Sequence, residues 1–193
     1  MYEVEIKVPT DVEAVRERLR RTDAERVGAR RQRDVYYDAP HRDFAETDEA
    51  LRLRRETPIA SVSDSRSARD ADGFETTTLT YKGPLVDEES KTRIEHETGV
   101  DDGEAASGVF SGLGFEPAAT VEKRREFWRY DGYTVALDDV DGLGEFVEVE
   151  REVEDESAVE SARDAAVDVL SELGLDGTDQ IRTSYLGLLL AEE

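Results

Sequence analysis

The sequence predicts an α+β protein in which about eight antiparallel strands form a barrel or a sandwich with helices packed outside. Short segments in which apolar and charged residues alternate recur along the chain, and this period of two is typical of strands. Segments with a period near 3.6 residues lie between and after them, as expected for helices that cover an apolar sheet face. The chain of 193 residues has the length of one domain, so we expect residues 1–193 to form a single domain.

The first half of the chain contains most of the alternating segments. Residues 2–7 form the first predicted strand, with Val4 and Ile6 on one face and Glu5 and Lys7 on the other. Thr10 and Glu13 fit a capping box that opens a helix over residues 11–22. Alternation predicts further strands at residues 25–38, 50–56, 74–82 and 90–99, with a short turn near residues 42–44 and a strand end at Gly83-Pro84. Residues 57–73 lack periodicity, and we interpret them as a mobile surface loop.

The second half combines a strand meander with helices. Residues 101–114 carry apolar side chains at helical spacing. Strands are predicted at residues 119–130, 133–139 and 145–152, joined by the Asp131-Gly132 turn and by a turn that contains Gly142 and Gly144. A helix over residues 156–173 ends at Gly174, and a last short helix begins near Ser184.

Composition excludes several classes of function. The net charge of −23 argues against a general surface for nucleic acid or anionic membranes. No segment approaches the roughly 20 apolar residues of a membrane span and no leader is apparent, so we expect a cytoplasmic protein. The basic residues include only four lysines beside 48 acidic residues, which indicates a cytoplasm of very high salt. Without cysteine and with two histidines, any metal is expected to be a hard cation held by carboxylates.

The predicted strands carry like-charged pairs on one face. Solvated faces of a very acidic protein are one explanation, but that explanation predicts acidic faces throughout. Three basic pairs run against the composition: Arg52 and Arg54, Lys91 and Arg93, and Lys123 and Arg125. A shared cavity with cations on some walls and carboxylates on others becomes stable when a polyanion and a divalent metal fill it together. All four lysines lie within or at the end of these charged strands.

An ordered set of motifs carries a resemblance to a known family. The set resembles the CYTH, or triphosphate tunnel metalloenzyme, superfamily, and most closely its archaeal branch related to class IV adenylyl cyclases. It consists of Glu3-x-Glu5-x-Lys7, Arg52-x-Arg54, Lys82, Lys91-x-Arg93-x-Glu95-x-Glu97, Lys123-x-Arg125, Asp138 and Glu148-x-Glu150. The resemblance implies an eight-stranded antiparallel β-barrel, with helices outside, that binds a triphosphate lengthwise together with Mg²⁺ or Mn²⁺.

The resemblance also implies roles for single residues. Catalysis would rest on Lys7, Lys123 and Arg125. The triphosphate would be held by Lys7, Arg52, Arg54, Lys82, Lys91, Arg93, Lys123 and Arg125. The metal would be held by Glu3, Glu5, Asp138, Glu148 and Glu150, while Glu95 and Glu97 would either bind metal or orient the cations.

Three functions are compatible with these residues. The first is a cyclase that converts ATP to cyclic AMP and pyrophosphate. The second is a triphosphatase that hydrolyses inorganic, thiamine or nucleoside triphosphate, and the third is a module that only binds polyphosphate or nucleotide. A complete set of metal carboxylates disfavours the third. The motifs predict triphosphate chemistry with a small-molecule partner, whereas the nucleoside pocket carries no readable motif and the sequence leaves homodimerisation open.

Overall fold

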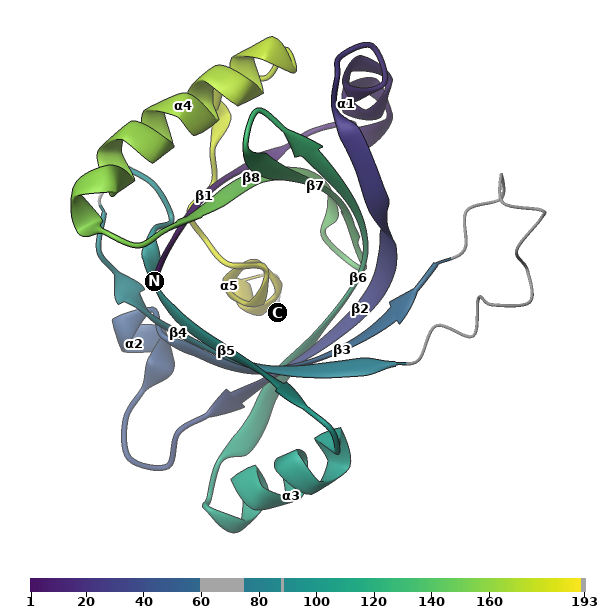
Figure 1. Cartoon of the computed structure of the whole chain (residues 1–193). Helices are drawn as coiled ribbons and strands as arrows, with labels where there is room; N and C mark the ends of the chain where they lie inside the picture. Colours follow the sequence, from purple (N-terminus) through teal and green to yellow (C-terminus); the bar gives the residue numbers. More distant parts are fainter. Residues whose placement is uncertain (60–74, 88, 192–193) are drawn as a thin grey trace.

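Eight antiparallel strands close into one barrel in the computed structural model of the protein (Figure 1), which describes residues 1–59, 75–87 and 89–191. The barrel alternative to a sandwich is therefore confirmed. The strands are β1 (Tyr2–Pro9), β2 (Glu25–Asp38), β3 (Ala50–Pro58), β4 (Thr76–Leu85), β5 (Arg93–Val100), β6 (Glu116–Tyr130), β7 (Tyr133–Val140) and β8 (Gly144–Val153).

The strand order around the barrel is β1-β5-β4-β3-β2-β6-β7-β8. β1 closes the barrel because it pairs along its whole length with β8 and, at Tyr2 and Glu3 only, with β5. The predicted meander of three strands is present as β6, β7 and β8. In its first turn, Asp131 and Gly132 adopt φ values of 47° and 77°, the left-handed conformations that a tight hairpin of this kind requires.

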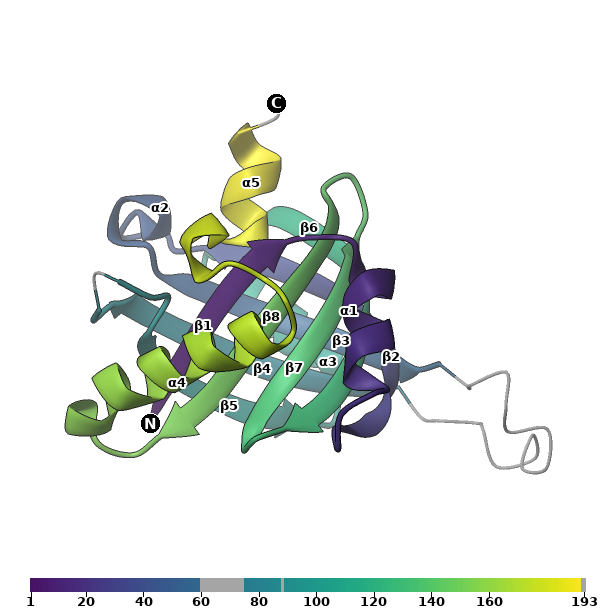
Figure 2. The same ribbon diagram turned by 90° about the horizontal axis from the view of Figure 1, so that it is seen from above.

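The apolar core lies outside the barrel, between strands and helices. The helices are α1 (Val12–Leu19), α2 (Phe44–Thr47), α3 (Gly103–Gly112), α4 (Val159–Glu172) and α5 (Tyr185–Ala191), with short 3₁₀ turns at Glu156–Ala158 and Gly177–Asp179. α1 and α4 cover the outer faces of β1, β7 and β8 (Figures 1 and 2), where Ile6, Val135 and Val149 are buried against Val15 and Leu170. With the apolar side of these strands covered outside, their alternate residues point into the barrel.

Several predicted boundaries were wrong. Asp11, not Thr10, caps α1, because its side chain accepts hydrogen bonds from the backbone N–H groups of Glu13 and Ala14. β4 continues through Gly83-Pro84 to Leu85, because the pairing with β5 shifts register there and the missing proline N–H interrupts no regular ladder. β5 begins at Arg93 instead of residue 90.

Two further differences concern a helix and the predicted loop. α3 forms within the predicted range, yet it buries none of its residues, and Val109 and Leu113 are 58% and 64% exposed. β3 extends to Pro58, two residues beyond the predicted strand end. Residues 60–74, most of the predicted 57–73 loop, lie outside the described residues. None of the helices within the described ranges is long and apolar enough to cross a membrane.

Candidate active site

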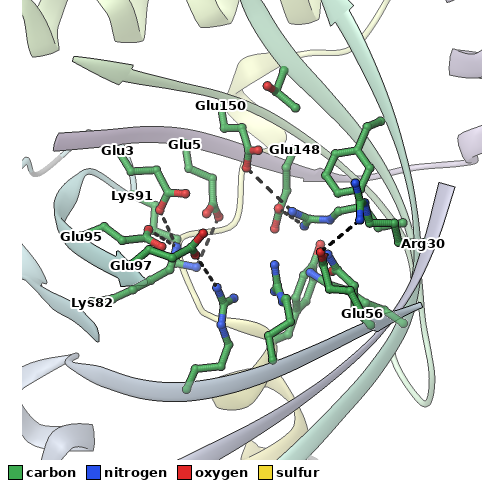
Figure 3. Close-up of a pocket in the computed structure, with 18 of the residues that line it drawn as sticks. Glu3, Glu5, Arg30, Glu56, Lys82, Lys91, Glu95, Glu97, Glu148 and Glu150 are labelled. Carbon is green, nitrogen blue, oxygen red and sulfur yellow. Dashed lines mark hydrogen bonds and ion pairs between the residues drawn. The ribbon is translucent and has the colours of Figure 1, made fainter. Parts of the chain in front are cut away.

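The barrel encloses a cavity of about 950 Å³ that is lined by side chains from all eight strands. Its volume is at the upper end of the range for small-molecule sites, about 300–1,000 Å³. Figure 3 shows Glu3, Glu95 and Lys82 gathered on one side of the cavity, with Arg30 and Glu56 on the opposite side. The sequence predicted a shared cavity with cations on some walls and carboxylates on others. This cavity is the space inside the closed barrel.

Most of the predicted site residues line this cavity. The predicted phosphate-binding cations that do so are Arg52, Arg54, Lys82, Lys91, Arg93, Lys123 and Arg125. The carboxylates that do so are Glu3, Glu5, Glu95, Glu97, Glu148 and Glu150. Lys7 and Asp138 are not among the lining residues, although both are buried and contact residues that are: Lys7 lies against the ring of Tyr185, and Asp138 bonds Lys123 and Arg125.

Asp34 anchors the cations of β3. The register of β2 and β3 places Asp34 opposite Arg54, and its two carboxylate oxygens each accept a 2.7 Å hydrogen bond from that guanidinium. Arg52 lies 3.6 Å from the same carboxylate. Burial alone would raise the pKa of Asp34, but the two guanidiniums lower it strongly. Asp34 therefore remains an anion that fixes two cations at the cavity wall.

A second buried carboxylate anchors the cations of β6. Asp138, with no exposed surface, accepts a 2.6 Å hydrogen bond from Nε of Arg125 and lies 3.2 Å from Nζ of Lys123. Arg125 also donates to Glu148 on β8. Burial and the neighbouring Arg125 lower the pKa of Lys123 to about 8. The predicted Lys123-x-Arg125 pair is thus held by Asp138, which contacts both cations, and by Glu148, which accepts from Arg125.

Tyr185, the first residue of α5, closes one end of this network. Its hydroxyl donates a 2.9 Å hydrogen bond to Asp138, and its ring lies 4.8 Å from Nζ of Lys123 and 4.2 Å from Nζ of Lys7. Lys7 donates a 2.7 Å hydrogen bond to the carbonyl oxygen of Thr183. Burial and the nearby Lys91 lower the pKa of Lys7 to about 7. Figure 2 shows α5 projecting from this end of the barrel.

The remaining lysines pair with carboxylates of β1 and β5. Lys82 donates to Glu3 and lies 2.8 Å from Glu95. Burial would lower the pKa of Lys82, but these two carboxylates raise it well above its usual range. Lys91 lies 3.3 Å from Glu5. Lys82 therefore remains charged beside its two acidic partners, and Lys91 forms an ion pair with Glu5.

Arg93 is held by an irregular backbone turn. Its guanidinium donates a 2.7 Å hydrogen bond to the carbonyl oxygen of Asp48 and lies 2.8 Å from the carboxylate of the same residue. Asp48 adopts φ 52°, a left-handed conformation that aspartate tolerates better than most residues. Nε of both Arg52 and Arg93 is buried and lacks a hydrogen-bond partner among the described residues. These donors have capacity left for phosphate oxygens.

The carboxylates of β1 and β8 crowd one another. Burial raises the pKa of Glu150 to about 8. Arg125 opposes this rise, whereas the neighbouring Glu3 and Glu148 add to it. Burial also raises the pKa of Glu3. Carboxylate oxygens are the preferred ligands of hard divalent cations, and such a charge would relieve this repulsion. Across the described ranges, however, no three acidic or histidine side chains converge as a ready-made metal centre.

Asp34 and Tyr185 were not among the predicted site residues. Asp34 lies in the segment Arg33-Asp34-Val35, where no charged pair marks a site. The available signal was the hairpin register, which places Asp34 opposite Arg54. Tyr185 contacts Asp138, which is 47 residues away in the sequence. No local sequence pattern predicts a contact over that separation.

Comparison with known proteins identifies the family. The profile of the CYTH domain matches residues 1–185. This chain belongs to the CYTH domain family. Membership implies a divalent metal and a triphosphate substrate, in agreement with the two signs of charge inside the barrel.

Relatives of the CYTH protein cover between 80% and 99% of its length. It is 35% identical over 189 residues to a protein of Methanocaldococcus jannaschii named "Putative adenylate cyclase MJ0240", covering 97% of this chain and 98% of the relative. It is 25% identical over 154 residues to "Adenylate cyclase CyaB" of Aeromonas hydrophila, covering 80% and 70% of the two chains. The solved structure of the PH1819 protein from Pyrococcus horikoshii is 36% identical and covers 99% of both chains with a TM-score of 0.87.

Proposed function

We propose that this CYTH protein is a divalent-metal-dependent enzyme that converts ATP to cyclic AMP and pyrophosphate, in the manner of class IV adenylyl cyclases. The observation that carries the proposal is the cavity of about 950 Å³ inside the barrel, in which cations and carboxylates from seven of the eight strands face one another. The names of the M. jannaschii and A. hydrophila relatives support cyclase activity.

The cations of β3, β5 and β6 would bind the three phosphates. Arg52 and Lys123 are almost completely buried while lining the cavity, so a bound phosphate would be shielded from water. In such a site fixed charges stabilise the transferring phosphoryl group and the leaving pyrophosphate more strongly than in water. Cyclisation forms a bond between the ribose 3′ oxygen and the α-phosphorus, breaks the bond to the bridging oxygen of the pyrophosphate, and releases the proton of the 3′ hydroxyl.

The carboxylates of β1 and β8 would hold Mg²⁺ or Mn²⁺. We assign this role to Glu3, Glu5, Glu148 and Glu150, whose crowding fits a hard cation. When bound, the metal would neutralise charge on the phosphate oxygens. Glu95 and Glu97 would instead orient cations, because Glu95 pairs with Lys82 and Glu97 lies 3.9 Å from Arg52.

Asp138 and Lys7 would act through the cavity-lining residues that they contact. Asp138 already holds Lys123, Arg125 and Tyr185, so we propose that it positions these groups instead of binding metal. Lys7 is a positioning residue in the same sense, because its ammonium group contacts Thr183 and the ring of Tyr185 at the end occupied by α5.

A product assay tests this function. The protein is incubated in concentrated KCl with Mg²⁺ or Mn²⁺ and, separately, ATP, inorganic triphosphate and thiamine triphosphate, and the products are separated. We expect cyclic AMP and pyrophosphate from ATP. Phosphate release without cyclic AMP would replace the cyclase with a triphosphatase, and tight binding without turnover would replace it with a binding module.

Two variants test whether the activity depends on side chains inside the barrel. Lys123→Ala removes a cation from the cavity wall and should reduce turnover by orders of magnitude while the barrel stays folded. Arg124→Ala removes the next side chain along β6, which is exposed on the outer face, and should leave turnover unchanged. Full activity in Lys123→Ala would refute the interior site.

A further inference from the structure

Lys91, one of the cations predicted to bind the triphosphate, lines the cavity from a segment that precedes a strand. β5 begins at Arg93, so Lys91 lies two residues before it. The backbone N–H of Lys91 donates a 3.2 Å hydrogen bond to the carbonyl oxygen of Glu5, and its ammonium group lies 3.3 Å from the carboxylate of the same residue (Figure 3). A lysine carries its charge on a flexible four-carbon stem. The position of this charge therefore depends on how firmly the backbone of Lys91 is held.

Two buried hydroxyl groups flank Lys91 in the sequence. Ser90 and Thr92 are both 0% exposed, and neither is among the residues that line the cavity. The hydroxyl of Ser90 donates a 2.5 Å hydrogen bond to the carboxylate of Asp87 and lies 2.6 Å from the hydroxyl of Thr92. A hydroxyl group has one proton to donate, and that of Ser90 is used by Asp87. Thr92 therefore donates to Ser90, and the three side chains form a chain of hydrogen bonds that ends on a carboxylate.

Asp87, at the end of this chain, contacts α4 and the segment that precedes α5. Arg163 on α4 lies 3.5 Å from its carboxylate, and Arg182 donates a 3.4 Å hydrogen bond to its carbonyl oxygen. Burial would raise the pKa of Asp87, but the hydrogen bond from Ser90 and the nearby Arg163 lower it. Asp87 therefore remains an anion at a fixed place, and it can anchor the hydroxyl groups of Ser90 and Thr92.

We propose that Ser90 and Thr92 are positioning residues, which hold the backbone of Lys91 so that its ammonium group meets the triphosphate inside the barrel. This inference rests on the proposed function and adds residues that do not touch the ligand. Because the two hydroxyl groups bond each other across Lys91, they restrict the backbone torsions of the residue between them. Buried hydroxyl groups cost free energy unless they are hydrogen-bonded, and apolar side chains of the same shape would fill this space without that cost. Their presence beside a cavity cation thus indicates a role in placing it.

Calorimetric titration of the full chain with α,β-methylene-ATP and Mg²⁺ tests the inference without requiring turnover. Thr92→Val removes the hydroxyl group and keeps the shape of the side chain, so the dissociation constant should rise by about 2- to 12-fold, the range that one lost hydrogen bond spans. Ser90→Ala should cause a loss of the same order. Thr92→Ser keeps the hydroxyl group and should retain the affinity of wild type. Thr178→Val is the matched control, because the hydroxyl of Thr178 donates to Asp176 at an exposed position.

A double-mutant cycle with Lys91→Ala separates positioning from a purely structural role. If Ser90 acts through Lys91, Ser90→Ala should raise the dissociation constant in the wild-type background and leave it unchanged in the Lys91→Ala background. A purely structural role would instead lower the affinity equally in both backgrounds, or in neither. Urea-induced unfolding of the same proteins checks that each of them is folded at the temperature of the titration.

Three results would contradict this inference. Wild-type affinity in both Ser90→Ala and Thr92→Val, or an equal loss in the two backgrounds, would overturn it and leave the triphosphate site standing. An unchanged dissociation constant in Lys91→Ala would overturn it by removing Lys91 from that site. Failure of the wild type to bind α,β-methylene-ATP would overturn the proposed function as well.

Discussion

Asp34 on β2 and Arg54 on β3 form a two-bond ion pair inside the barrel, with both hydrogen bonds 2.7 Å long. Asp34 is only 1% exposed, so its charge is compensated by protein cations instead of water. Asp138 on β7 forms a similar buried ion pair with Arg125 on the neighbouring strand β6. Two buried carboxylates thus hold the cations that we assign to phosphate binding.

Removal of the Asp34 charge should destabilise the protein strongly. Asp34→Asn leaves Arg54 buried without its anion, and breaking a buried pair in this way costs about 3–5 kcal/mol. Denaturant-induced unfolding near neutral pH measures the loss. Asp139→Asn makes the same chemical change at an exposed position on the outer face of β7 and should alter the free energy of unfolding little. Equal stabilities of the two variants would contradict an anchoring role for Asp34.

The Tyr185 hydroxyl should contribute measurably to stability. Tyr185→Phe removes the hydrogen bond to Asp138 but keeps the ring beside Lys7 and Lys123. A hydrogen bond to a charged group contributes about 1.5–3 kcal/mol, and thermal unfolding should show a loss of that order. Tyr130→Phe is the matched control, because Tyr130 bonds Glu172 at the surface and should contribute far less. The account fails here if both substitutions have the same small effect.

Triphosphate affinity should depend on the protonation of Lys123. Burial and Arg125 lower its pKa to about 8, so the side chain is a cation below that pH and loses its charge above it. In metal-free buffer, the affinity of wild type for inorganic triphosphate should fall relative to Lys123→Arg as the pH rises from 7 to 9, because arginine stays protonated. Titrations of both proteins across this range measure the ratio. A constant ratio would show that Lys123 does not titrate in contact with the ligand.

Glu150→Gln should raise the free energy of unfolding and weaken metal binding. Burial, with Glu3 and Glu148, raises the pKa of Glu150 to about 8, whereas an unfolded glutamate ionises near about 4.3. Between these pH values the native state binds one more proton than the unfolded chain, so the stability of wild type falls as the pH rises. Relative to wild type, metal-free Glu150→Gln should therefore gain about 1 kcal/mol or more between pH 5 and pH 8, one pKa unit being worth 1.36 kcal/mol.

The same variant should bind Mn²⁺ more weakly, because a carboxylate ligand becomes a neutral amide. A Mn²⁺ titration with a bound triphosphate analogue measures this loss. Glu104→Gln, at an exposed position in the first turn of α3, serves as the control. An unchanged Mn²⁺ titration would remove Glu150 from the proposed metal site, and a stability difference that is independent of pH would contradict the crowding of its carboxylate.

The barrel was predictable from sequence because its strands alternate with unusual clarity. A strand such as Tyr2–Pro9 buries its apolar residues under α1 and α4. The residues that alternate with them then face the interior of the barrel. The paired cations followed from the same alternation. Strand ends were less predictable, since the continuation of β4 through Gly83-Pro84 depends on a register shift against β5.

The support behind the site was not predictable in the same way. Asp34 and Asp138 meet the phosphate-binding cations across neighbouring strands, and Tyr185 meets them from a segment that is distant in the sequence. Asp138 could be placed in the site from family resemblance, but its bonds to Arg125 and Lys123 required the register of β6 and β7. Val27 has no pairing partner on β6 because of a β-bulge, and the alternation of residues along β2 does not predict that bulge.

A crystal structure of the protein with Mn²⁺ and α,β-methylene-ATP would locate the nucleotide and the metal. We expect the phosphates inside the barrel in contact with Arg52, Lys123 and Arg125, and an anomalous Mn²⁺ signal beside Glu148 and Glu150. A nucleotide bound outside the barrel, or phosphates inside it without contact to the β3 and β6 cations, would refute the interior triphosphate site.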